Sequence, residues 1–226
     1  MSTRILVTGF SAFPRAPVNP SQVLVELLAG MTAQDLGLGP DVDLFTQVLP
    51  VEYEAVPGRL EELGRDVAPD IAIHFGLAET AAGFRLERTA RNVASLLAPD
   101  AAGYLPLAAS IADGADTVAS TLPLEAIAAA LKVRGLPVQS SVHAGTYLCN
   151  FLFYRSCAGL HAGFRPSMAG FVHIPFLDTQ LATLSAARAA KLPSLSLDHL
   201  VDGARIILAT CAAEYRAATA QVAAAN

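Results

Sequence analysis

Short apolar runs alternate along the chain with longer stretches of helical periodicity. Five runs have the length and content of buried strands, at residues 5–10, 44–49, 71–75, 138–142 and 170–174. Helical spacing of apolar residues predicts helices at 20–30, 53–67 and 123–134, one from 145 onward, and one from 197 to about 220. Strands separated by helices imply parallel pairing with helices on both faces. We therefore expect one α/β domain over residues 1–226, an α/β/α sandwich around a mostly parallel, twisted sheet.

Local signals mark several of these boundaries. Asn19 is suited to cap the first helix, Pro20 fits its first turn, and Gly30 suits its end. Ser196 is the expected cap of the last helix. Residues 77–120 show no clean period, so we expect an irregular region with short strands there.

Composition and charge exclude several classes of protein. The chain is 53% hydrophobic and 15% charged, which suits a sizeable core. A net charge of −5 without a polybasic run argues against nucleic acid and against a membrane surface as partners. No apolar segment is long enough to span a bilayer, and the first apolar run is too short for a signal peptide, so we expect a cytoplasmic protein. Three cysteines without a Cys-x-x-Cys pair predict neither a disulfide framework nor a zinc site.

Cys149 is the first candidate for chemistry. A strand ends near His143, Gly145 makes a turn, and the apolar residues that follow predict a helix with Cys149 near its start. Unpaired backbone N–H groups and the helix dipole favour a thiolate there, so we expect a lowered thiol pKa. The same N–H groups can stabilise an oxyanion. For the cysteine alone, ordinary packing in the core is the more common role.

His173 is the second candidate. In open α/β sheets, sites form at the carboxyl ends of strands, and the sequence places residues 9–10, Gly76, residues 143–144 and His173 at such ends. A cysteine and a histidine on neighbouring strand ends form the pair that nucleophilic catalysis needs. A third group must orient the imidazole. The residues alone do not rank the acidic candidates, which are Glu87, Asp70, Asp178 and Asp198.

Several motifs carry a resemblance to a known family. The segments GTYLCN, GFVHIPF and SLSLDH, ILVTGF followed by VNPS, and PDIAIHFG followed by ER and RN resemble pyroglutamyl peptidase type I, in the same order from about residue 4 to 208. The resemblance implies an α/β cysteine peptidase that removes N-terminal pyroglutamate through a thioester, without metal or cofactor, usually as a homotetramer. It implies that the catalytic residues are Cys149, His173 and Glu87. It implies that the substrate contacts are Phe10, Phe13, Asn19, Leu77 and Tyr147.

The chain departs from the family pattern around the expected pocket. Residues 77–81 read Leu-Ala-Glu-Thr-Ala where the family usually has Gln-Ala-Gly-Gly-Arg. The Gly-Gly of the family's first loop is replaced around residues 14–15, and Leu97 aligns with an arginine that the family often carries. Leu77 has no polar side-chain atom, so we expect weaker binding of the lactam.

Three other readings compete with this one. A cysteine amidase of the same fold for a different small acyl group fits the same residues. A non-catalytic protein that binds a lactam or a peptide end fits the fold, although intact Cys149, His173 and Glu87 argue against it. A nucleotide-binding Rossmann protein is disfavoured because no G-x-G-x-x-G follows the first strand.

Overall fold

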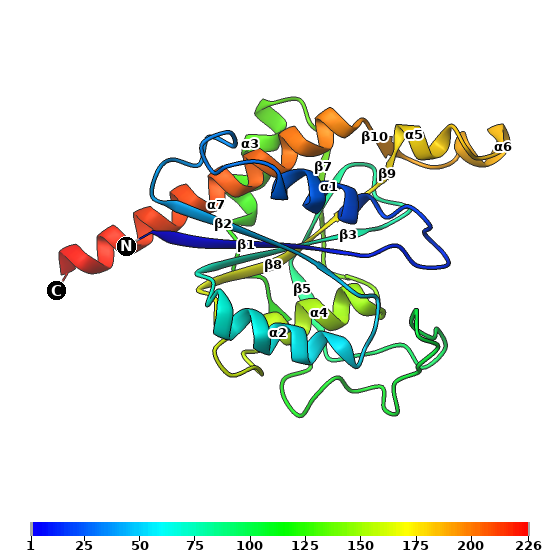
Figure 1. The fold of residues 1–226 in the computed structure, drawn as a ribbon, viewed down its shortest axis with the longest axis horizontal. Helices are drawn as coiled ribbons and strands as arrows, with labels where there is room; N and C mark the ends of the chain where they lie inside the picture. The colour runs from blue at the N-terminus through cyan, green and yellow to red at the C-terminus, as the bar shows by residue number, and fades with distance from the viewer. Residues whose placement is uncertain (1, 226) are drawn as a thin grey trace.

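The computed structural model describes residues 2–225, which form ten strands and seven helices (Figure 1). The strands are β1 (Thr3–Phe10), β2 (Val42–Leu49), β3 (Ile71–Leu77), β4 (Phe84–Glu87), β5 (Thr89–Arg91), β6 (Thr117–Ala119), β7 (Val138–Ser141), β8 (Met168–Ile174), β9 (Phe176–Leu177) and β10 (Ser194–Leu195). The helices are α1 (Pro20–Ala29), α2 (Ala55–Asp66), α3 (Leu124–Val133), α4 (Leu148–Cys157), α5 (Asp178–Leu181), α6 (Ala186–Ala189) and α7 (Leu197–Ala225). None of these helices is long and apolar enough to cross a membrane.

Six strands form the central sheet in the order β2-β1-β3-β8-β4-β7. The first four run parallel, β4 is antiparallel to β8, and β7 is parallel to β4. The predicted α/β fold with a mostly parallel sheet is therefore confirmed. Residues 143–144 follow the end of β7 as expected, but β7 runs opposite to β8, so this strand end and the end of β8 that carries His173 point in opposite directions.

Helices cover both faces of this sheet (Figure 1). α1, α3 and α7 lie on one face, and α2 and α4 lie on the other. Successive strand residues alternate between the two cores: Ile5 and Val7 pack with the α1/α3/α7 side, whereas Leu6 packs with the α2/α4 side. Every strand of the sheet centre is therefore apolar on both faces, which explains the continuous apolar runs.

The structure differs from the predicted elements at four places. The irregular region contains β4, a strand of the central sheet, besides the short strands β5 and β6. α4 begins at Leu148 rather than near residue 145, and α7 continues to Ala225 rather than ending near 220. Residues 176–195 form β9, α5, α6 and β10, which extend away from the body of the molecule (Figure 1). These segments are too short to show a hydrophobic period.

Candidate active site

Strand alternation turns His173 toward the face of the sheet on which α4 lies. Ala169 and Phe171 of β8 pack on the α2/α4 side, so His173 points the same way. The β3–β8 register pairs Gly76 with His173. A Cβ at Gly76 would lie 3.0 Å from the sulfur of Cys149, so the thiol lies directly against this strand pair. A glycine at 76 leaves the space that the sulfur occupies.

Glu87 reaches His173 from the neighbouring antiparallel strand. The β4–β8 register pairs Arg85 with His173, so Glu87, two residues on, faces the same side of the sheet. His173 Nδ1 lies 2.9 Å from Glu87 Oε1, and the carboxyl group is fully buried. A carboxylate can only accept, so Nδ1 carries the proton and Nε2 is left as a proton acceptor.

The other acidic candidates lie in different surroundings. Asp70 accepts hydrogen bonds from the Arg4 backbone N–H and the Tyr215 hydroxyl. Asp178 accepts one from the Ser194 hydroxyl, and Asp198 lies in the first turn of α7. The structure therefore singles out Glu87, among the four acids, as the group beside the imidazole.

The pKa of the Cys149 thiol runs against the prediction made from its position. Cys149 is the second residue of α4, and its own backbone N–H does lower the pKa. Burial raises it more, and the Glu87 carboxylate adds to the rise, so that the pKa reaches about 12. The prediction of a lowered pKa is therefore wrong for the site without substrate. A raised pKa favours the neutral thiol over the thiolate at neutral pH.

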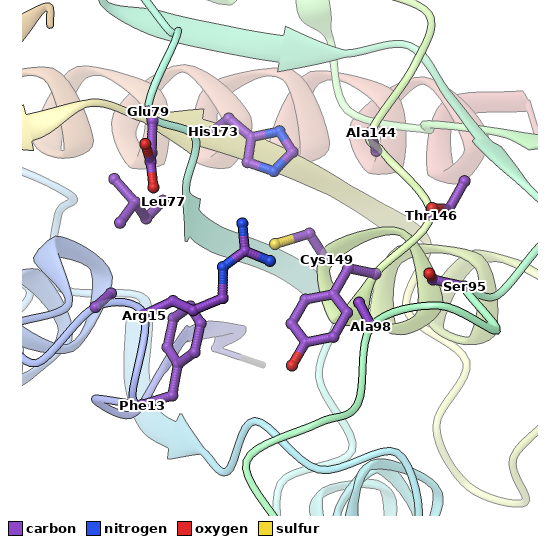
Figure 2. Close-up of a pocket in the computed structure, with 12 residues that line it drawn as sticks. Phe13, Arg15, Leu77, Glu79, Ser95, Ala98, Ala144, Thr146, Cys149 and His173 are labelled. Carbon is purple, nitrogen blue, oxygen red and sulfur yellow. The ribbon is translucent and has the colours of Figure 1, made fainter. Parts of the chain in front are cut away.

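A cavity of about 380 Å³ opens in front of the thiol (Figure 2). Cys149 and His173 lie on its wall together with three of the predicted substrate contacts, Phe13, Leu77 and Tyr147. The remaining lining residues are Arg15, Ala16, Glu79, Ser95, Ala98, Ala144 and Thr146.

Two predicted substrate contacts lie elsewhere. Phe10 is 3% exposed and packs in the core on the α2/α4 side. Asn19 caps α1: its side-chain oxygen accepts from the Ser21 N–H, and its amide donates to the Ser11 carbonyl. Neither residue lines the cavity in this structure.

Sequence reasoning missed several residues of the cavity wall. Arg15 and Glu79 fall within two of the segments that depart from the family pattern, and this departure was the available signal. Asp100 was not foreseen at all, although its carboxylate anchors the loop that carries Ser95 and Ala98. Within residues 2–225 no group of three or more His, Cys, Asp or Glu side chains is arranged to hold a metal ion.

A thiol beside a buried imidazole–carboxylate pair, at the rim of a parallel sheet, defines a cysteine-type hydrolase. The sequence profile of the family described as pyroglutamyl peptidase matches residues 3–214. A pyrrolidone-carboxylate peptidase from Vibrio vulnificus is 35% identical over 210 residues, which are 92% of each chain. Another, from Pyrococcus furiosus, is 35% identical over 79% of this chain and 83% of its own.

Solved structures agree with these relatives. The pyrrolidone carboxyl peptidase of Fervidobacterium islandicum AW-1 superposes with a TM-score of 0.83 at 36% identity, covering 92% of this chain and 97% of that one. Pyroglutamyl peptidase I of Bacillus amyloliquefaciens gives 0.80 at 30% identity, over 95% and 98%. The chain belongs to the pyroglutamyl peptidase family and is a cysteine-type peptidase.

Proposed function

We propose that this enzyme removes N-terminal pyroglutamate from peptides with a blocked amino end. The observation that carries the proposal is the 2.9 Å contact between His173 Nδ1 and Glu87 Oε1, with the Cys149 thiol beside that histidine in one cavity. The volume of about 380 Å³ suits a small ring. Phe13 and Tyr147 offer aromatic surface to that ring.

The first half of the reaction makes a thioester. His173 Nε2 takes the proton of the Cys149 thiol. The sulfur attacks the carbonyl carbon of the peptide bond that follows the pyroglutamyl ring, not the carbonyl carbon within the ring. The charge that develops on the carbonyl oxygen is stabilised by free N–H groups at the start of α4, whose first intrahelical bond is donated by Phe151. The histidine then gives the proton to the leaving nitrogen, and the C–N bond breaks. Glu87 holds the imidazole and stabilises its charged form throughout.

The second half releases the acid. Water enters as the leaving peptide departs, and His173 takes one of its protons while the oxygen attacks the thioester carbon. The carbon–sulfur bond breaks, Cys149 regains a proton from His173, and free pyroglutamate leaves. The rise of the Cys149 pKa fits this scheme, because a raised pKa makes the thiolate a transient species rather than a resting one.

We also propose that residues 1–226 act as one domain, in the cytoplasm, as a homotetramer. One sheet with a core on each face supports the first statement. A catalytic thiol, with all three cysteines free, fits a reducing compartment. The tetramer rests on the family resemblance, and light scattering tests it: a mass of 23.5 kDa at micromolar concentration contradicts it.

Hydrolysis of a pyroglutamyl amide tests the function. We expect the wild type to release the amine, Cys149→Ser and His173→Ala to lose nearly all turnover, and Glu87→Gln to lose less, since an amide oxygen can still accept from Nδ1. Cys157→Ser is the matched control, because this cysteine is free but does not line the cavity, and it should keep its activity. Turnover by Cys149→Ser at the wild-type rate rules out the assigned nucleophile.

A further inference from the structure

A lactam ring in this cavity brings two polar atoms that need partners. Its carbonyl oxygen accepts hydrogen bonds and its N–H donates one, and either atom is costly to bury unpaired. The side chains expected to meet them do not do so. Asn19 is committed to capping α1, Leu77 has no polar atom, and the Tyr147 hydroxyl donates to the Pro99 carbonyl.

Arg15 and Glu79 can supply the hydrogen-bond partners that the lactam carbonyl and N–H need. Figure 2 shows the guanidinium of Arg15 reaching into the cavity between Leu77 and Cys149, with Glu79 on the wall next to Leu77. Neither charged side chain has a hydrogen-bond or ion-pair partner in residues 2–225. A guanidinium can only donate and a carboxylate can only accept, so the two match a ring that carries one acceptor and one donor.

The other polar side chains of the cavity are less well placed. Ser95 and Thr146 lie on the wall opposite Leu77 and Glu79 (Figure 2). The Ser95 hydroxyl already accepts a hydrogen bond from the Leu97 N–H. Cys149 and His173 are occupied by the reaction itself.

We propose that Arg15 and Glu79 are the residues that select the lactam, Arg15 by donating to its ring carbonyl and Glu79 by accepting from its ring N–H. This inference rests on the proposed function and assigns the specificity of the same site. Hydrogen bonds to charged groups are stronger than those between neutral groups, so the pair offsets the apolar side chain of Leu77. The Arg15 contact also selects against an N-terminal proline, whose ring has no carbonyl to accept from the guanidinium.

Three small ring compounds test the two contacts separately. 2-Pyrrolidinone has the carbonyl and the N–H, whereas N-methyl-2-pyrrolidinone and cyclopentanone keep only the carbonyl. Each is measured as a competitive inhibitor of pyroglutamyl-amide hydrolysis. We expect Arg15→Met to raise the inhibition constant of all three by about tenfold, or ~1.4 kcal/mol. We expect Glu79→Met to raise that of 2-pyrrolidinone alone, by a similar factor.

Matched controls come from the exposed face of α7. Arg205→Met and Glu214→Met remove the same two charges from the protein far from the cavity lining, and they should leave all three inhibition constants unchanged. Arg15 is exposed and Glu79 partly so, and circular dichroism should show that both cavity variants keep the wild-type fold.

The outcomes separate this inference from the proposed function. A wild type that neither hydrolyses the pyroglutamyl amide nor is inhibited by 2-pyrrolidinone overturns both. A wild type that does both, with Arg15→Met inhibition constants unchanged, overturns the inference and leaves the function standing. If Arg15→Met lowers only kcat, or affects only substrates with an acidic leaving residue, the arginine acts on the reacting charge or on the leaving peptide, and the assignment to the lactam carbonyl is wrong.

Discussion

Asp100 anchors one wall of the cavity, and its removal should loosen that wall without touching the proposed catalytic groups. One carboxylate oxygen accepts from the Tyr53 N–H at 2.8 Å, and the other accepts from the Ala102 and Tyr104 N–H groups at 2.9 Å each. The loop residues just before Asp100 include Ala98, which lines the cavity, and Pro99, whose carbonyl accepts a hydrogen bond from the Tyr147 hydroxyl. The carboxylate thus ties this loop to the segment before α2.

The expected loss of stability follows from these three hydrogen bonds. A hydrogen bond to a charged group contributes about 1.5–3 kcal/mol, and an N–H left buried without a partner costs about 1–3 kcal/mol. The Tyr53 residue is 2% exposed, so its N–H bears the full cost, whereas Ala102 is exposed and water can replace its bond. We expect Asp100→Ala to lower the free energy of unfolding by about 2–4 kcal/mol. We expect KM for a pyroglutamyl amide to rise several-fold, with kcat changed little.

Urea unfolding and steady-state kinetics measure the two effects. Asp113→Ala is the control, because this aspartate lies further along the same irregular region and is exposed. Asp100→Asn should fall between the wild type and Asp100→Ala, since an amide presents one acceptor oxygen and not two. The reasoning fails if Asp100→Ala is as stable as the wild type, or if the loss appears in kcat with KM unchanged.

Two further predictions concern the protonation states of Cys149 and His74. Since burial raises the Cys149 pKa to about 12, the rate of its alkylation by iodoacetamide, taken as the difference from Cys149→Ser, should keep rising from pH 7 to 10; a plateau below pH 7 contradicts this. Burial lowers the pKa of His74 to about 3, between the Thr8 and Ser156 hydroxyls, so its ring NMR signals should not titrate between pH 7 and 5. Since the folded pKa lies below the unfolded one, His74 makes folding less favourable as pH falls from about 6.5 toward 3, by up to ~1.4 kcal/mol per pH unit.

The main elements of the fold were predictable because their signals are local. The run at 71–75 is apolar on successive residues since both of its faces are buried, and the first helix has its cap, its proline and its terminal glycine in the sequence. The strand β4 was not predictable, since its four residues show little period. It is specified by pairing with β8, whose residues lie about 86 positions away along the chain.

The candidate site was likewise predictable only where its residues lie in elements with a local sequence signal. Cys149 and His173 stand at the ends of elements that can be located from local pattern, so they were candidates from the residues alone. Glu87 could not be chosen among four acids by that route, because only the tertiary register of β4 brings it to the imidazole. The pKa of Cys149 was mistaken for a related reason: the helix start is a local feature, whereas burial and the Glu87 charge come from the rest of the fold.

The register of β4 thus determines whether Glu87 meets His173 in the proposed catalytic site. Side chains alternate along a strand, so a slip of one residue would turn Glu87 away from His173 and bring Leu86 toward it. Gly83 opposes such a slip: a Cβ there would lie 2.2 Å from the Pro137 carbonyl, to which the next residue, Phe84, donates its N–H. The close approach fixes where β4 begins against the end of the α3–β7 connection. The segment between Leu77 and this glycine can therefore vary in sequence, as it does here, while the carboxylate stays in contact with the imidazole.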